Sequence, residues 1–392
     1  MKLSKRVETL TPSTTLAITA KAKELKQQGI DVISFGAGEP DYNTPQHIID
    51  AANKAMTSGH TKYTPAAGLP ELRKAICEKF KQDNQLHYEP ANICVCNGGK
   101  HALYNIFQVL IDPGDEVIIP IPYWVSYPEQ VKLASGVPVF VEGKEANQFK
   151  ITAAELEAAI SDSTKVFVLN SPSNPSGTVY SKEELEALAE VCVRKNIFVI
   201  SDEIYEKLIY DDVQHISIAS LNEDIFKRTF VVNGVSKPYS MTGWRIGYVA
   251  GDKEIMKAII DLSSHSTSNP TTMSQWGALE AISGDQTPLE EMVKEFDKRR
   301  QVMVHLLNEI PGITCELPKG AFYAYFNVES LFNDAIQNAD QLATVLLEQA
   351  KVAVIPGSAF GSDKHIRLSY ATSMENIEQG IERIKNYVES AK

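Results

Sequence analysis

One lysine at the end of an apolar segment has surroundings that suggest chemistry. Lys237 stands between Ser236 and Pro238, shortly after the apolar run 229–232 and a break at Gly234. We expect an amine in this position to lose hydration, which favours its neutral form and makes it a nucleophile. Neutral lysines of this kind form Schiff bases with carbonyl compounds. The alternative is an ordinary lysine in a surface loop, and only the rest of the chain can decide between the two.

An acidic residue ends another predicted strand. Asp202 follows the apolar run 197–201, and Tyr205 comes three residues later. A carboxylate in this position either caps a helix or balances a buried cation. A pyridinium nitrogen is such a cation, because an ionised partner keeps it protonated and able to accept electrons.

Glycines join the predicted strand 92–96 to a helix. Gly98, Gly99 and Lys100 follow the strand directly. Backbone N–H groups at such a junction hold phosphate, although the same sequence also serves as a simple helix cap. The segment is not a P-loop, because the upstream glycine is missing and no Ser or Thr follows the lysine.

Two further residues have less specific surroundings. Asn174 lies in a loop with two prolines, which would hold its amide rigidly toward a ligand, unless the loop is only a turn. Arg367 lies within the predicted strand 366–370. Guanidinium binds a carboxylate through two parallel hydrogen bonds, although arginines on solvent-facing strands are also common.

Alternating strands and helices must position these residues. Such alternation, with several wholly apolar strands, predicts an α/β fold: a mostly parallel central sheet covered by helices on both faces. Ligands of such sheets bind at the carboxyl ends of the strands. After residue 311 the pattern changes to a smaller α+β domain. We therefore predict a large domain over residues 46–283 and a small one formed by residues 1–45 and 284–392. The predicted strands cover 32–35, 92–96, 116–119, 138–141, 165–169, 197–201, 229–232, 246–250, 321–328, 353–355 and 366–370.

Composition limits the classes of partner. The 392 residues carry a formal net charge of −12, which argues against nucleic acid or an anionic membrane. No apolar run reaches the length of a membrane span, and the start of the chain shows no signal-peptide core. Five cysteines make no disulfide framework, and eight histidines show no metal-ligand spacing. We expect a cytoplasmic protein without a metal.

Taken together, several motifs resemble those of the class I pyridoxal-phosphate-dependent aminotransferases of fold type I. The resemblance extends from about Ser4 to the C-terminus. Within the class, the sequence is most similar to the bacterial aspartate aminotransferases of the prokaryotic subgroup. That narrower likeness rests on Ser13-Thr14-Thr15, Gly98-Gly99-Lys100 and Tyr123-Trp124-Val125-Ser126-Tyr127. The motifs of the class are Asn174-Pro175-x-Gly177, Asp202-x-x-Tyr205, Ser236-Lys237, Met241-Thr242-Gly243-Trp244-Arg245-Ile246-Gly247 and Arg367-Leu368-Ser369.

The resemblance implies roles toward the cofactor, pyridoxal 5′-phosphate. Lys237 would form the Schiff base and, once displaced by substrate, move the substrate proton. Asp202 would pair with the pyridinium nitrogen, and Tyr205 with Asn174 would hydrogen-bond the phenolic oxygen. Trp124 would stack on the ring and border the substrate. The phosphate would be held by Gly98, Gly99, the Lys100 backbone, Arg245 and, from a second subunit, Tyr63.

It also implies how a substrate binds. Arg367 would grip the α-carboxylate, helped by Asn174 and the Gly38 backbone. The distal carboxylate would be taken by the Lys100 side chain, Ser13 and Thr15. The implied reaction converts L-aspartate and 2-oxoglutarate to oxaloacetate and L-glutamate by a ping-pong cycle, in a homodimer with shared sites.

The chain departs from the family pattern at two positions. Gly234 stands where some members have a serine that donates to the phosphate. Thr11 stands where relatives that also use prephenate carry a lysine, which argues against that second activity.

Other functions stay open from the residues alone. Within the fold they are an aminotransferase for aromatic or small neutral amino acids and a pyridoxal-phosphate-dependent C–S lyase. A cofactor-sensing regulator would normally carry a basic DNA-binding segment, and a dehydrogenase would need a dinucleotide fingerprint. The sequence contains neither.

Overall fold

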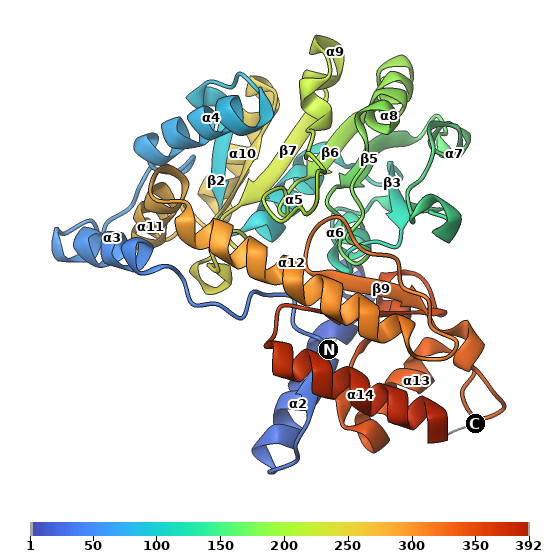
Figure 1. Cartoon of the computed structure of the whole chain (residues 1–392). Helices are drawn as coiled ribbons and strands as arrows, with labels where there is room; N and C mark the ends of the chain where they lie inside the picture. The colour runs from blue at the N-terminus through green and yellow to red at the C-terminus, as the bar shows by residue number, and fades with distance from the viewer. Residues whose placement is uncertain (1–2, 391–392) are drawn as a thin grey trace.

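A seven-stranded sheet forms the centre of the molecule. The computed structural model describes residues 3–390, shown in Figure 1. The strand order is β2-β8-β7-β6-β5-β3-β4, and neighbours are parallel except where β8 pairs with β7 and β2. The mostly parallel sheet predicted from the sequence is therefore confirmed. The strands are β2 (Ile93–Cys96), β3 (Glu116–Ile121), β4 (Val137–Glu142), β5 (Thr164–Asn170), β6 (Phe198–Asp202), β7 (Thr229–Gly234) and β8 (Gly247–Ala250).

Helices bury both faces of this sheet. Alternate residues of a strand point to opposite faces. In β5, Val166 and Val168 pack in one apolar cluster with α5, α6 and α10, whereas Phe167 and Leu169 pack in another with α7 and α8. Because both faces are covered at the centre of the sheet, the inner strands carry continuous buried apolar runs, such as 166–169 in β5 and 230–232 in β7. The helices of this part are α3 (Gln46–Thr57), α4 (Pro70–Asn84), α5 (Gly99–Leu110), α6 (Ser126–Leu133), α7 (Ala153–Ala159), α8 (Lys182–Arg194), α9 (Glu223–Phe226), α10 (Lys253–Ser266) and α11 (Thr272–Ser283).

Two smaller sheets lie in the remaining part of the chain. One is the parallel pair β1 (Ile33–Ser34) and β10 (Val352–Ala353), and the other is antiparallel with order β11-β12-β9. Figure 1 shows α12 crossing the molecule between the large sheet and the group that contains α2, α13 and α14. The other elements here are α1 (Lys5–Glu8), α2 (Thr14–Gln27), α12 (Thr287–Asn308), β9 (Tyr323–Asn327), α13 (Ala339–Val345), β11 (Ile355–Pro356), β12 (His365–Ser369) and α14 (Met374–Ser390).

The predicted strand 353–355 is wrong. The chain makes two short strands there, and they belong to different sheets: β10 pairs with β1, and β11 pairs with β12. Val354 lies between them and is buried. The residues of a short apolar run do not indicate that its two ends pair with different sheets. The division into residues 46–283 and the two flanking segments stays a prediction, and residues 1–2 and 391–392 of those segments lie outside the described part of the chain.

A buried arginine joins α12 to a loop that follows β6. The Arg300 side chain is fully buried, and it donates two hydrogen bonds to Asp211 at 2.8 and 3.2 Å and one to the Pro318 carbonyl at 2.7 Å. Its guanidinium also lies 4.6 Å from the centre of the Tyr210 ring. The charge is therefore well compensated, although it lies inside the protein. Within residues 3–390 no helix combines the length and apolarity needed to cross a bilayer.

Replacing this arginine should destabilise the fold. Arg300→Met leaves the Pro318 carbonyl without its donor, and an unsatisfied buried acceptor costs about 1–3 kcal/mol, so we expect the free energy of unfolding to fall by that order. Lys298→Met is the matched control on α12, because that side chain is 70% exposed and its ion pair with Glu295 has little effect. Urea unfolding at fixed cofactor concentration measures both variants. Equal stability of the two would contradict the assigned role.

Candidate active site

A cavity of about 290 Å³ lies where β5, β6 and β7 end. Side chains from both parts of the chain line it, which agrees with the rule that open α/β sheets bind ligands at the carboxyl ends of strands. Of the sequence-predicted residues, only Gly98 and Tyr63 are absent from the lining. The predicted residues that line the cavity are Ser13, Thr15, Gly38, Gly99, Lys100, Trp124, Asn174, Asp202, Tyr205, Lys237, Arg245 and Arg367.

Lys237 follows β7 by three residues and reaches into the cavity. Its Nζ donates a hydrogen bond of 2.6 Å to the Gly38 carbonyl. Burial lowers the pKa of Lys237 to about 8, with Glu39 acting against this and the positive charges of Arg245 and Arg367 adding to it. A substantial share of the amine is therefore neutral near pH 8, which is the state that attacks a carbonyl.

Asp202 is the last residue of β6 and is 5% exposed. The Tyr127 hydroxyl donates to its Oδ2 at 2.7 Å, and the Ile204 N–H donates to Oδ1 at 3.3 Å. Burial nevertheless raises the pKa of Asp202 to about 6, because these two donors and the nearby Lys237 do not fully replace water. The carboxylate is thus prepared to receive a cation.

Two tyrosines that line the cavity contact each other. The Tyr205 and Tyr323 hydroxyls are 2.8 Å apart, and the Tyr205 ring packs edge-on against Phe322 and Tyr323. Sequence reasoning assigned no role to Tyr127 or Tyr323. Tyr127 is part of a quoted motif but carried no chemical signal of its own, and Tyr323 lies in a strand rich in aromatic residues.

Arg367 lies in β12 with 2% of its surface exposed. It donates to Asn174 Oδ1 and to the Gly36 carbonyl, each at 3.0 Å. Its guanidinium lies 4.4 Å from the centre of the Tyr323 ring, and its buried Nε has no hydrogen-bond partner among the described residues. A buried cation held by neutral groups, with a donor left over, fits an anionic ligand.

Glycines and an arginine shape the start of α5. Gly98 caps the helix at φ +88° without a side-chain hydrogen bond, and a Cβ there would lie 2.4 Å from Arg245 Nη2. A Cβ on Gly247 would lie 2.3 Å from the Gly99 nitrogen. Free N–H groups at a helix N-terminus beside a guanidinium form an anion cradle. A serine in place of Gly234 would crowd this region, since its Cβ would lie 2.9 Å from Gly247 Cα.

The remaining predicted residues of the lining come from α2 and the residue before it, from α5 and from the segment before α6. Lys100 Nζ lies 4.9 Å from the centre of the Trp124 ring, and burial lowers the pKa of this lysine. Ser13 caps α2 by accepting from the Leu16 N–H at 3.4 Å, and the buried Thr15 hydroxyl has no partner among the described residues. Lys100 is thus a second cation in the cavity lining, besides Arg367, and suits a second anionic group.

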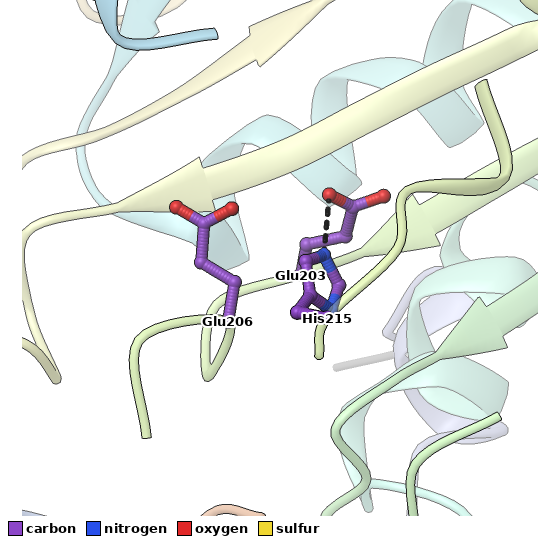
Figure 2. A group of neighbouring side chains, drawn as sticks. All are labelled: Glu203, Glu206 and His215. Carbon is purple, nitrogen blue, oxygen red and sulfur yellow. Dashed lines mark hydrogen bonds and ion pairs between the residues drawn. The ribbon is translucent and has the colours of Figure 1, made fainter. Parts of the chain in front are cut away.

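Glu203, Glu206 and His215 form a separate cluster, shown in Figure 2. His215 lies 3.0 Å from a Glu203 oxygen. Partners of the two carboxylates are Ser201, Ser217, Lys79 and Asn84. Because these oxygens are already paired with protein groups, the cluster anchors the segment that carries Asp202 and Tyr205.

Comparisons with known proteins agree with this geometry. Residues 30–384 match the family model of aminotransferase class I and II. The aspartate aminotransferase of Bacillus subtilis is 58% identical over 390 residues, which cover 99% of each chain. The solved structure of an aspartate aminotransferase from Rhizobium meliloti has a TM-score of 0.96 at 42% identity and covers 99% of each chain. The Thermus thermophilus aspartate aminotransferase with maleate has a TM-score of 0.94 at 44% identity, over 98% of this chain and 99% of that one.

The chain belongs to the class I and II aminotransferases. Aminotransferases of this type use pyridoxal 5′-phosphate, and the site fits that cofactor. Lys237 supplies an amine of lowered pKa, Asp202 a carboxylate that lacks a cation, and the start of α5 with Arg245 a cradle for phosphate. The individual roles given to the site residues stay predictions.

The close packing at Gly247 gives a test of the phosphate cradle. In this aminotransferase, Gly247→Ala should push the backbone of Gly98 and Gly99 out of place. Overpacking of this kind costs 1–3 kcal/mol, so we expect the affinity for pyridoxal phosphate to fall about tenfold or more. Titration of the cofactor-free protein with pyridoxal phosphate measures this affinity. Gly243→Ala is the control, because a Cβ at Gly243 meets nothing within 4 Å. The idea fails if both variants bind as the wild type does.

Proposed function

We propose that this enzyme is an aspartate aminotransferase, which converts L-aspartate and 2-oxoglutarate to oxaloacetate and L-glutamate. The observation that supports this proposal is that Arg367 and Lys100, two cationic side chains, line the same cavity. Arg367, which donates to Asn174, would bind one carboxylate of the substrate, and Lys100 with Ser13 and Thr15 would bind the other. All four substrates and products are dicarboxylates, so each can bind both cations at once.

The relatives support this substrate class. Three curated relatives at 57–58% identity are named aspartate aminotransferase, and one solved structure of the family was determined with maleate, a dicarboxylate. They do not favour an aminotransferase for aromatic or neutral amino acids, or a C–S lyase. We also propose that prephenate is not a substrate, because Thr11 carries no charge to bind it.

Different residues bind the substrate, transfer its proton and keep the cofactor protonated. Arg367 binds the α-carboxylate and places Cα near Lys237, whose neutral amine takes the Cα proton and later returns it. Bound pyridoxal phosphate supplies the electron sink for the negative charge that develops at Cα. Asp202 keeps the proton on the ring nitrogen, which the sink requires, and Tyr127 holds the carboxylate in place.

A half-reaction tests the proposal directly. Aspartate added without an oxo acid should convert the visible absorbance of the bound cofactor, and 2-oxoglutarate added afterwards should restore it. Stoichiometric oxaloacetate should appear in the first step and glutamate in the second. Conversion by phenylalanine or alanine but not by aspartate would contradict the substrate assignment. Release of pyruvate without an acceptor would indicate a lyase.

Lys100 should determine the preference for dicarboxylates. A charge-assisted hydrogen bond contributes about 1.5–3 kcal/mol, so Lys100→Ala should lower kcat/KM for aspartate at least about tenfold more than for alanine. Arg367→Lys is the comparison, because loss of the two-point grip on the α-carboxylate should affect both donors alike. Steady-state kinetics with both donors decides between the outcomes. A uniform loss in Lys100→Ala would mean that this lysine serves the phosphate.

We further propose a homodimer whose two sites are each completed by Tyr63 from the neighbouring subunit. Tyr63 is 90% exposed and lies outside the cavity, although the family motif gives it a role toward phosphate. An isologous dimer presents one loop twice and so completes two equivalent sites.

Hybrid dimers test this arrangement. Mixing Tyr63→Ala subunits with Lys237→Ala subunits should give one site with both changes and one with neither. Activity at limiting cofactor should therefore recover after the two inactive proteins are unfolded and refolded together. A fully active monomer in sedimentation would refute the shared site.

We also propose a cytoplasmic location. All five cysteines are buried and unpaired, which suits a reducing compartment.

A further inference from the structure

Tyr323 lies between two residues that serve different parts of the reaction. It is the first residue of β9, paired with Ser369 of the strand that carries Arg367. Its ring is fully buried and lies 4.4 Å from the guanidinium of Arg367, while its hydroxyl is 2.8 Å from that of Tyr205. The side chain thus touches the predicted carboxylate grip with its ring and the predicted ring-oxygen donor with its hydroxyl.

Each of the two hydroxyls carries a proton, and the hydrogen bond between them uses only one of the two. Burial raises the pKa of both tyrosines, so both stay protonated at neutral pH. Among residues 3–390, Tyr205 is the only hydrogen-bond partner of the Tyr323 hydroxyl. Either hydroxyl can be the donor of this bond, and both residues line the cavity. When Tyr205 donates its proton to the cofactor, as its predicted role requires, its oxygen is left to accept from Tyr323, whose buried hydroxyl then also has an acceptor.

We propose that Tyr323 is a positioning residue that turns the Tyr205 proton toward the anionic ring oxygen of the cofactor. Linked hydrogen bonds polarise one another, so the bond from Tyr323 also makes Tyr205 a stronger donor. The proposal rests on the predicted role of Tyr205 and extends it by one residue from the other part of the chain. The ring of Tyr323 separately supports Arg367 through its aromatic face.

The pH dependence of the visible absorbance of bound pyridoxal phosphate reports on this oxygen. The ring oxygen of bound pyridoxal phosphate shares a proton with the nitrogen of Lys237. When Tyr205 donates less strongly to this oxygen, the shared proton is held more tightly. We expect Tyr323→Phe to raise the pH midpoint by about half a pKa unit, as the loss of one ordinary hydrogen bond would do. Tyr205→Phe should raise it more, and the double variant should match Tyr205→Phe, because Tyr323 acts only through Tyr205.

Controls separate this effect from general disturbance. Tyr325 lies two residues along β9, is 5% exposed and has a buried hydroxyl without a partner, so Tyr325→Phe should leave the midpoint unchanged. The charged groups that face the cavity are Asp202, Lys237, Arg245, Arg367 and Lys100, and all of them are retained in every variant. Because phenylalanine keeps the ring beneath Arg367, Tyr323→Phe should lower kcat while KM for aspartate stays nearly constant.

Several results would overturn the proposal. One is an unchanged or lowered pH midpoint in Tyr323→Phe. Another is that Tyr323→Phe shifts the midpoint equally in the wild type and in Tyr205→Phe. A downward shift would mean that Tyr323 draws the proton away from the cofactor. An unchanged midpoint in Tyr205→Phe would remove the role of Tyr205 as well. The proposed function is tested apart from all of these by the conversion of wild-type absorbance with aspartate.

Discussion

The burial of one carboxylate at the end of β6 is the constraint on which the site depends. Asp202 is removed from water but meets only a tyrosine hydroxyl and one backbone N–H, so its pKa rises to about 6. Such a group is stabilised when a cation joins it. The free energy gained by burying apolar residues on both faces of the large sheet offsets the cost of burying this carboxylate.

Other buried polar groups in the cavity also lack a full set of partners. Lys237 is a buried amine whose pKa falls to about 8, and Arg367 is a buried guanidinium held by an amide and a carbonyl. Thr15 adds a buried hydroxyl without a partner among the described residues. Each group lacks the counterpart that a phosphorylated pyridine aldehyde or a dicarboxylate would supply. Groups that lack a counterpart inside the protein are expected where a ligand binds.

The sequence predicted the parts of the site that lie at strand ends or in specific motifs. Lys237, Asp202 and the glycines before α5 follow apolar runs, and the carboxyl ends of neighbouring parallel strands meet. Contacts made by packing could not be predicted in this way. Tyr127 meets Asp202 across 75 residues and Tyr323 meets Tyr205 across 118. The same limit explains the error at 353–355, where residues distant in sequence decide which sheet each half joins.

The state of Asp202 in the cofactor-free protein tests this account most directly. Its pKa is higher in the folded chain than the ordinary 3.8, so a rising pH removes the proton from the unfolded chain first and destabilises the fold. Between pH 4.5 and 6.5 the wild type should lose about 2 kcal/mol of unfolding free energy relative to Asp202→Asn, which does not titrate. Parallel stability curves would mean that the carboxylate of the folded chain is already ionised across this range, at an ordinary or a lowered pKa, and would contradict the account.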